Sequence, residues 1–160
     1  MADAAVNVAT IDTPAEELTI RTSRFGEITV EADKVITMTS PFLGFPESRR
    51  FVLRPHGQDS PFMWLQSLDN PNLAFVVLHA ASFLPAYQPH IPAFALKELG
   101  SPAQGQLEIF TILTIPTNSP EKMTANLLAP VAINLARRLA KQILLDPLHH
   151  DPCWPVFSQA

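Results

Sequence analysis

Prolines are spread through the apolar segments of this sequence, and they constrain its fold more than any other feature. The chain has 16 prolines in 160 residues, about twice the average share of roughly 5%. A proline inside a helix removes one backbone hydrogen bond and clashes with the preceding turn. We therefore expect no long helix, and we look for the core in short strands joined by turns.

The size and composition are those of one folded domain. A chain of 160 residues buries roughly 70% of its unfolded surface when it folds. Apolar residues make up 47% and charged residues 16%, which is far from the charge-rich composition of disordered chains. Residues 1–16 mix alanine, threonine and acidic residues with little periodicity. They are predicted to be a flexible N-terminal leader that precedes the domain at residues 17–160.

Alternating apolar and polar residues predict the strands. A period of two, typical of a half-buried strand, occurs in residues 25–30 (FGEITV) and 34–38 (KVITM), and the longest strand signal is at 107–116. Residues 73–78 (LAFVVL) form an unbroken β-branched and aromatic run, which is typical of a strand buried on both faces. A mostly β fold with a sheet of six to eight strands follows from this count.

The segment after residue 125 leaves helix and strand open. Its large apolar residues recur near helical spacing, but Pro130 would interrupt the hydrogen bonding of a helix. We favour two strands, at 126–134 (NLLAPVAIN) and 141–145 (KQILL). The residues between them, 135–140, are then a turn or a short helical piece.

The charge balance argues against direct nucleic-acid binding. The net charge is −4, so a broad phosphate-binding surface is not favoured and a basic protein partner is the easier match. Two small basic clusters are more typical of a solvated rim than of a binding patch: Arg49, Arg50 and Arg54, and Arg137, Arg138 and Lys141.

The sequence carries no signal for export or for a membrane. Residues 1–5 have no basic residue and no apolar run follows them, unlike a secretory signal. The most apolar stretch, 73–84, is shorter than the ~20 residues that a spanning helix needs. A single cysteine, Cys153, allows no disulfide within the chain, which suits a reducing cytosol. We expect a cytoplasmic protein without membrane contact.

One turn contains the residue types of a hydrolase site. His56, Asp59 and Ser60 lie within five positions of one another, but no glycines surround Ser60 as they would in a nucleophile elbow. Their simplest role is to stabilise the turn through bonds to nearby backbone. We therefore predict no catalytic residue, and expect the protein not to be an enzyme.

The C-terminal tail contains potential metal ligands. They are His149, His150, Asp151 and Cys153. Adjacent histidines in a tail rarely converge on one ion, and no second ligand pair occurs elsewhere at zinc spacing. We predict neither a metal site nor a cofactor.

Five segments, in this order and with this spacing, resemble the flagellar assembly factor FliW family. They are FGEITV (25–30), LGFPESRRFVL (43–53), PFMWLQSLDNPNLAFVVL (61–78), EIFTILTIP (108–116), and MTANLLAPVAIN followed by KQILL (123–145). Each segment alone is a common strand-and-turn pattern. Their ordered succession is specific, and it covers residues 25–145.

The resemblance implies a fold and a role. The fold is a single-domain, mostly antiparallel β-barrel-like structure with short helical turns. The role is a regulatory binding protein whose partners are the RNA-binding translational repressor CsrA and flagellin. Binding to CsrA would relieve repression of flagellin synthesis, and free flagellin would compete for the same protein. The alternative is a small cytosolic β-barrel enzyme or ligand-binding protein, which requires a deep polar pocket with perturbed titratable groups.

Three loops supply candidate partner-binding residues. The loop at 41–46 (PFLGFP) carries two phenylalanines that either form an interface or plug one end of the barrel. The turn at 68–72 (LDNPN) has side chains that form turns or contact a partner. An asparagine ahead of Pro130 is expected to bond across the barrel end. The candidates are Phe42, Leu43, Gly44, Phe45, Asp69, Asn70 and Asn126.

Overall fold

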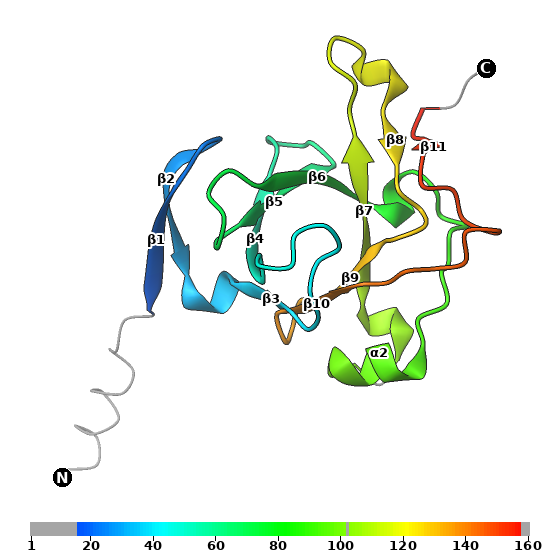
Figure 1. Ribbon diagram of the computed structural model, residues 1–160, viewed down its shortest axis with the longest axis horizontal. Helices are drawn as coiled ribbons and strands as arrows, with labels where there is room; N and C mark the ends of the chain where they lie inside the picture. The colour runs from blue at the N-terminus through cyan, green and yellow to red at the C-terminus, as the bar shows by residue number, and fades with distance from the viewer. Residues whose placement is uncertain (1–15, 102, 158–160) are drawn as a thin grey trace.

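The computed structural model describes residues 16–101 and 103–157, and it contains a closed seven-stranded β-barrel (Figure 1). The leader predicted for residues 1–16 lies outside this range except for Glu16. The carbonyl oxygen of Glu16 accepts a hydrogen bond from the Ala32 N–H at 2.8 Å. The mostly β prediction is confirmed. The described chain has eleven strands, more than the six to eight predicted, and seven of them form the ring.

Seven strands close the barrel. Around the ring they are β3 (Ile36–Met38), β4 (Arg50–Pro55), β5 (Phe62–Ser67), β6 (Ala74–His79), β7 (Glu108–Thr114), β9 (Val131–Asn134) and β10 (Leu139–Gln142). Neighbouring strands are antiparallel except β3 and β10, which pair in parallel and close the ring. The predicted antiparallel barrel is therefore correct with one exception, which joins the first and last thirds of the chain.

The other described strands lie outside the ring. β1 (Glu17–Thr22) and β2 (Gly26–Glu31) form a separate hairpin, and β8 (Thr124–Ala125) pairs with the end of β7 and with β11 (Trp154–Pro155). The described helical pieces are α2 (Ala93–Glu98) and the 3₁₀ turns η1 (Ala32–Lys34), η2 (Ala80–Ser82), η3 (Gln104–Gln106) and η4 (Pro120–Lys122). No helix in the described part of the chain is both long enough and apolar enough to span a membrane.

Alternation along the strands fills the barrel interior. Each fully buried large apolar side chain contributes about 1.5–3 kcal/mol relative to its exposed state. The inward-facing cluster includes Ile36, Met38, Phe51, Leu65, Val77, Phe110, Val131 and Ile133, each at most 5% exposed. Side chains, and not an open channel, therefore occupy the centre of the ring.

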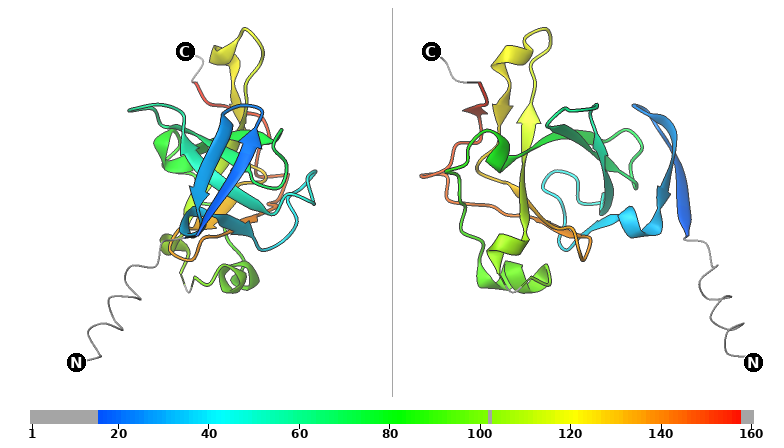
Figure 2. Two further views of the ribbon diagram at one scale, coloured as in Figure 1. Left: turned by 90° about the vertical axis from the view of Figure 1, so that its left-hand side faces the viewer. Right: turned by 180° about the vertical axis from the view of Figure 1, so that it is seen from behind.

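The outside of the ring is covered on two sides. The β1–β2 hairpin packs Ile28 and Val30 against Val52 of β4 and Leu68, and it stands beside β3 and β4 in Figures 1 and 2. On another side, α2 contributes Ala95 to a cluster with Ala132 and Ile143. Val52 and Ala132 alternate along their strands with inward-facing residues and point out of the barrel. The hairpin and α2 therefore shield these outward-facing apolar side chains from solvent.

Two segments differ from the sequence prediction in detail. The last hairpin has two strands, but both differ in extent from the prediction. β9 covers only residues 131–134 of the predicted 126–134. β10 covers residues 139–142, so it begins within the predicted turn at 135–140 and ends before 143–145. Arg138 ends the observed turn with a φ of 57°, a conformation that no periodicity reveals. The proline-rich connection before β7 contains α2, whose first residues follow Pro92. Proline is tolerated at a helix start, which explains how this helix fits among prolines.

Gly100 ends α2 in a left-handed conformation that favours glycine. Its φ is 67°, its N–H donates to the Lys97 carbonyl, and the Ser101 N–H donates to the Leu96 carbonyl, each at 3.0 Å. These two bonds make a Schellman motif. A Cβ at this position would lie 2.8 Å from Nε of Arg137, so the backbone conformation favours glycine and any larger residue must also displace the Arg137 guanidinium.

We expect Gly100→Ala to lower the free energy of unfolding by about 1–2 kcal/mol, because alanine is strained at positive φ and its methyl group would displace Arg137. Urea unfolding measures the change. Gly57→Ala is the control, because a Cβ there meets no atom within 4 Å and the stability should remain nearly unchanged. Equal stability of the Gly100→Ala variant and the wild type would contradict this account.

Candidate partner-binding site

The loop at residues 41–48 closes one end of the barrel with Phe42. This side chain is 2% exposed, and its ring stacks on Phe75 with centroids 4.8 Å apart and planes at 9°. It also contacts the Phe51 ring, whose centroid lies 5.6 Å from that of Phe42. The sequence left two roles open for this phenylalanine, an interface residue or a plug of the barrel end. Phe42 is the plug, and its buried ring is not presented to a partner.

The tip of the same loop carries exposed apolar side chains. Leu43 is 54% exposed and Phe45 is 39% exposed, and Gly44 between them has a φ of 84°. The Phe45 N–H donates to the Phe42 carbonyl at 2.9 Å, which makes a tight turn. Because the buried Phe42 anchors the loop, the exposed side chains of Leu43 and Phe45 are presented to solvent from a backbone with a fixed conformation.

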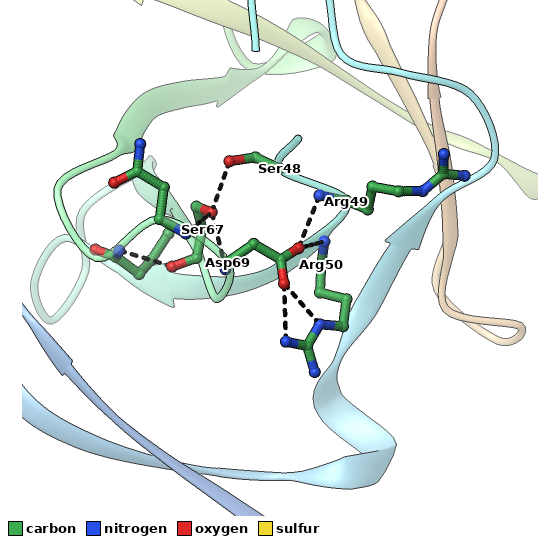
Figure 3. A network of polar contacts seen from close by, with 7 residues as sticks. Ser48, Arg49, Arg50, Ser67 and Asp69 are labelled. Carbon is green, nitrogen blue, oxygen red and sulfur yellow. Dashed lines mark hydrogen bonds and ion pairs between the residues drawn. The ribbon is translucent and has the colours of Figure 1, made fainter. Parts of the chain in front are cut away.

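Asp69 joins this loop to the β5–β6 turn (Figure 3). Its Oδ2 accepts hydrogen bonds from the backbone N–H groups of Arg49 and Arg50, each at 2.8 Å, and its Oδ1 accepts two more from the Arg50 guanidinium at 3.0 and 2.8 Å. Ser67 Oγ accepts from the Asp69 and Asn70 N–H groups and donates to Ser48 Oγ at 3.0 Å. One side chain thus fixes the segment that enters β4 relative to the turn that leaves β5.

The same contacts shift the pKa of Asp69. Partial burial alone raises the pKa of this carboxyl group, but the hydrogen bonds from the Arg50 side chain and from the Arg49 and Arg50 N–H groups outweigh burial. The net effect lowers the pKa below its ordinary value of 3.8. The carboxylate is therefore more stable in the folded protein than in the unfolded chain.

A hollow of about 400 Å³ lies between the loop and the turn. Its lining includes Gly44, Phe45, Asp69 and Asn70, which the sequence placed on separate segments. Glu47 adds an acidic group to the rim. Four of the seven predicted residues therefore meet at one hollow, and Leu43 is exposed on the loop that forms one wall; whether they bind a partner stays a prediction. We call this surface the loop–turn site.

Asn126 does not line the loop–turn site. Its Oδ1 accepts hydrogen bonds from the Leu128 and Ala129 N–H groups at 3.0 and 3.1 Å, so it shapes its own connection and does not bond across the barrel end as expected. Gln142 links the two regions, because its Oε1 accepts from the Leu43 N–H and its Nε2 donates to the Ala129 carbonyl. Sequence reasoning missed Gln142, although a polar residue inside the apolar run KQILL was a signal.

The hydrolase-like residues form a turn. Ser60 Oγ accepts a hydrogen bond from the Phe62 N–H at 3.2 Å, Asp59 has a φ of 63°, and the His56 ring stacks on Trp64 at 6.1 Å. His56 is thus oriented toward an aromatic ring and Ser60 toward the backbone. Among the described residues, no group of three or more His, Cys, Asp or Glu side chains is placed to hold a metal ion.

A larger hollow, of about 680 Å³, lies between residues 84–88 and residues 147–154. Tyr87 lines it, and burial raises the pKa of this phenol. Its hydroxyl donates to the Leu127 carbonyl at 2.7 Å, and its ring contacts His150 edge-on. Tyr87 therefore connects Leu127 to the C-terminal segment, residues 146–157, through its hydroxyl and its ring.

The geometry defines a class of protein: a small filled β-barrel whose loop–turn site presents apolar tips and a fixed polar turn to the surface. The comparisons agree with this class. The family model described as FliW protein matches residues 19–156. The chain therefore belongs to the FliW family.

Similar proteins cover most of the chain. The flagellar assembly factor FliW of Bdellovibrio bacteriovorus is 39% identical over 140 residues, which is 88% of this chain and 79% of that protein. The flagellar assembly factor FliW of Geobacter sulfurreducens is 38% identical over 143 residues, or 89% of each chain. A crystal structure of the flagellar assembly factor FliW superposes with a TM-score of 0.81 at 29% identity, covering 89% of this chain and 99% of the other. The barrel predicted from the resemblance is thus confirmed.

We expect Asp69→Asn to lower the free energy of unfolding by about 1–3 kcal/mol at neutral pH, because the Arg50 ion pair is lost and fewer N–H groups find an acceptor. Because the pKa of Asp69 is lowered in the folded protein, the extra stability of the wild type is fully present above about pH 4 and is progressively lost as the pH falls below that value. Urea unfolding of both proteins from pH 7 to pH 3 measures this convergence.

Asp59→Asn is the matched control, because Asp59 also lies on a turn but forms no ion pair among the described residues. Its effect on the free energy of unfolding should be small. A constant difference between wild type and Asp69→Asn across the pH range would show that the carboxylate charge contributes nothing.

Proposed function

We propose that this protein is a non-enzymatic regulator of flagellar assembly that acts in the bacterial cytoplasm. It binds the RNA-binding translational repressor CsrA and thereby relieves repression of flagellin synthesis, and free flagellin competes for it. The observation that carries the proposal is membership in the FliW family, whose relatives are named flagellar assembly factors.

The surface of the protein supports a binding role. An exposed Leu43 and Phe45 on a loop anchored by Phe42 offer apolar contact area at low entropic cost, because the loop is already fixed. The adjoining hollow has polar groups from the β5–β6 turn. Apolar anchors beside oriented polar groups are typical of protein interfaces.

Charge supports the choice of a basic partner. The chain has 15 acidic and 11 basic residues other than histidine. A CsrA-type repressor must present a basic surface to RNA, so an acidic protein attracts the repressor and repels the RNA phosphates. Part of the antagonism is then electrostatic and depends on ionic strength.

Isothermal titration with CsrA of the same organism, before and after saturation with flagellin, tests the partner switch. We expect binding to CsrA that flagellin abolishes, and an affinity for CsrA that falls several-fold between about 0.05 and 0.5 M salt. Leu43→Ala should weaken binding to at least one of the two proteins. Leu148→Ala is its control, because Leu148 is 86% exposed on the C-terminal segment, outside the loop–turn site.

The outcomes are separable. Absence of binding to both proteins would refute the proposed function. Binding to CsrA that persists in excess flagellin would refute competition, and an affinity independent of salt would refute the electrostatic part.

A further inference from the structure

A cluster of arginines and aromatic rings lies where the tip of the β1–β2 hairpin meets β4 and β5. The Arg24 guanidinium lies over the Trp64 ring, 4.2 Å from its centroid, and the Arg54 guanidinium lies 4.8 Å from the centroid of Phe25. Phe25 meets Trp64 edge-on at 5.8 Å, and Arg54 is the direct cross-strand neighbour of Trp64. Each guanidinium thus lies over one of two rings that contact each other; we call these four residues the arginine–aromatic cluster.

Neither guanidinium has a carboxylate partner within 4.0 Å in the described part of the chain, although the protein carries more acidic than basic residues. Arg50 and Lys141, by contrast, are each paired with an acid. A guanidinium that lies over a ring keeps its in-plane N–H donors available for a bidentate bond to a carboxylate. The cluster is therefore a local positive site with spare donors on an acidic protein.

A polar hollow of about 310 Å³ adjoins the cluster. Arg24, Ser23 and Asn72 line it, and the floor includes Gln66. Gln66 is 0% exposed, and its Nε2 donates to the carbonyls of Ser67 and Leu73, but its Oε1 has no partner among the described residues. Because Gln66 is buried, the polar groups that the hollow exposes to a ligand are those of Ser23, Arg24 and Asn72.

This hollow shares the Pro71 wall with the loop–turn site, whose lining includes the exposed Phe45. The features required of a ligand are then a carboxylate at Arg24, a backbone polar group at Asn72, and apolar contact toward Phe45. An extended polypeptide segment with an aspartate or glutamate beside an apolar residue has all three.

We propose that the arginine–aromatic cluster and its hollow bind an acidic, extended segment of flagellin; this inference rests on the proposed function. Charge separates the two partners, because a repressor that presents a basic surface to RNA is repelled by Arg24 and Arg54. The cluster therefore discriminates against CsrA while it attracts the competitor. RNA itself is a poor occupant, since the chain as a whole is negative.

Titration of full-length wild type, Arg24→Ala and Arg24→Lys with flagellin and with CsrA tests the inference. We expect Arg24→Ala to weaken flagellin binding about tenfold and to leave CsrA binding unchanged or slightly stronger. Arg24→Lys should recover only part of the loss, because lysine lacks the planar bidentate donors. Arg21→Ala is the matched control: Arg21 is exposed on β1 of the same hairpin and does not line the hollow.

Melting temperatures of all variants exclude unfolding as the cause of any loss. The inference is overturned if Arg24→Ala weakens binding to CsrA or to an RNA oligonucleotide, or if it leaves binding to both proteins unchanged. It is also overturned if Arg21→Ala weakens flagellin binding as much as Arg24→Ala does. Wild-type protein that binds neither CsrA nor flagellin refutes the proposed function instead, so the two failures are distinguishable.

Discussion

The hydrogen bonds to the Asp69 carboxylate are the interaction on which the candidate site depends. They join the segment that enters β4 to the turn that leaves β5, and these are the two walls of the hollow at the barrel end. The plug formed by Phe42 fixes the same loop from the interior side, through its stack on Phe75. With both ends of the loop held, the exposed Leu43 and Phe45 occupy defined positions, which lowers the entropic cost of binding.

Local signals predicted most of the barrel, because each strand shows its own alternation of apolar and polar residues. They did not predict the parallel pairing of β3 with β10, since that contact joins residues about a hundred positions apart. They also did not distinguish Phe42 from Phe45. The two residues have the same chemistry on one loop, yet Phe42 is 2% exposed and Phe45 39%, a difference that arises only when the barrel end closes over Phe75.

The polar candidates show the same limit of sequence reasoning. Asp69 was expected to be a turn former or a contact residue, and it holds a turn through four hydrogen bonds, two of which come from the backbone of another strand. Asn126 bonds within its own connection. The longer link expected of Asn126 is made instead by Gln142, which sequence reasoning missed. Residue type predicted the kind of bond, while the partner depended on tertiary structure. The charges show the same limit: the acidic total is plain in the sequence, but the position of Arg24 over Trp64, without a carboxylate partner among the described residues, is not.

The central claim is that partners bind where the fixed loop, the β5–β6 turn and the hairpin tip meet. Hydrogen–deuterium exchange of the protein alone and with saturating flagellin tests it most directly, because bound segments lose exchange with solvent. The account predicts new protection concentrated in residues 22–26, 43–48 and 68–74, with little change in residues 146–157. Protection confined to residues 146–157, with the loop and the turn exchanging as in the free protein, would contradict it.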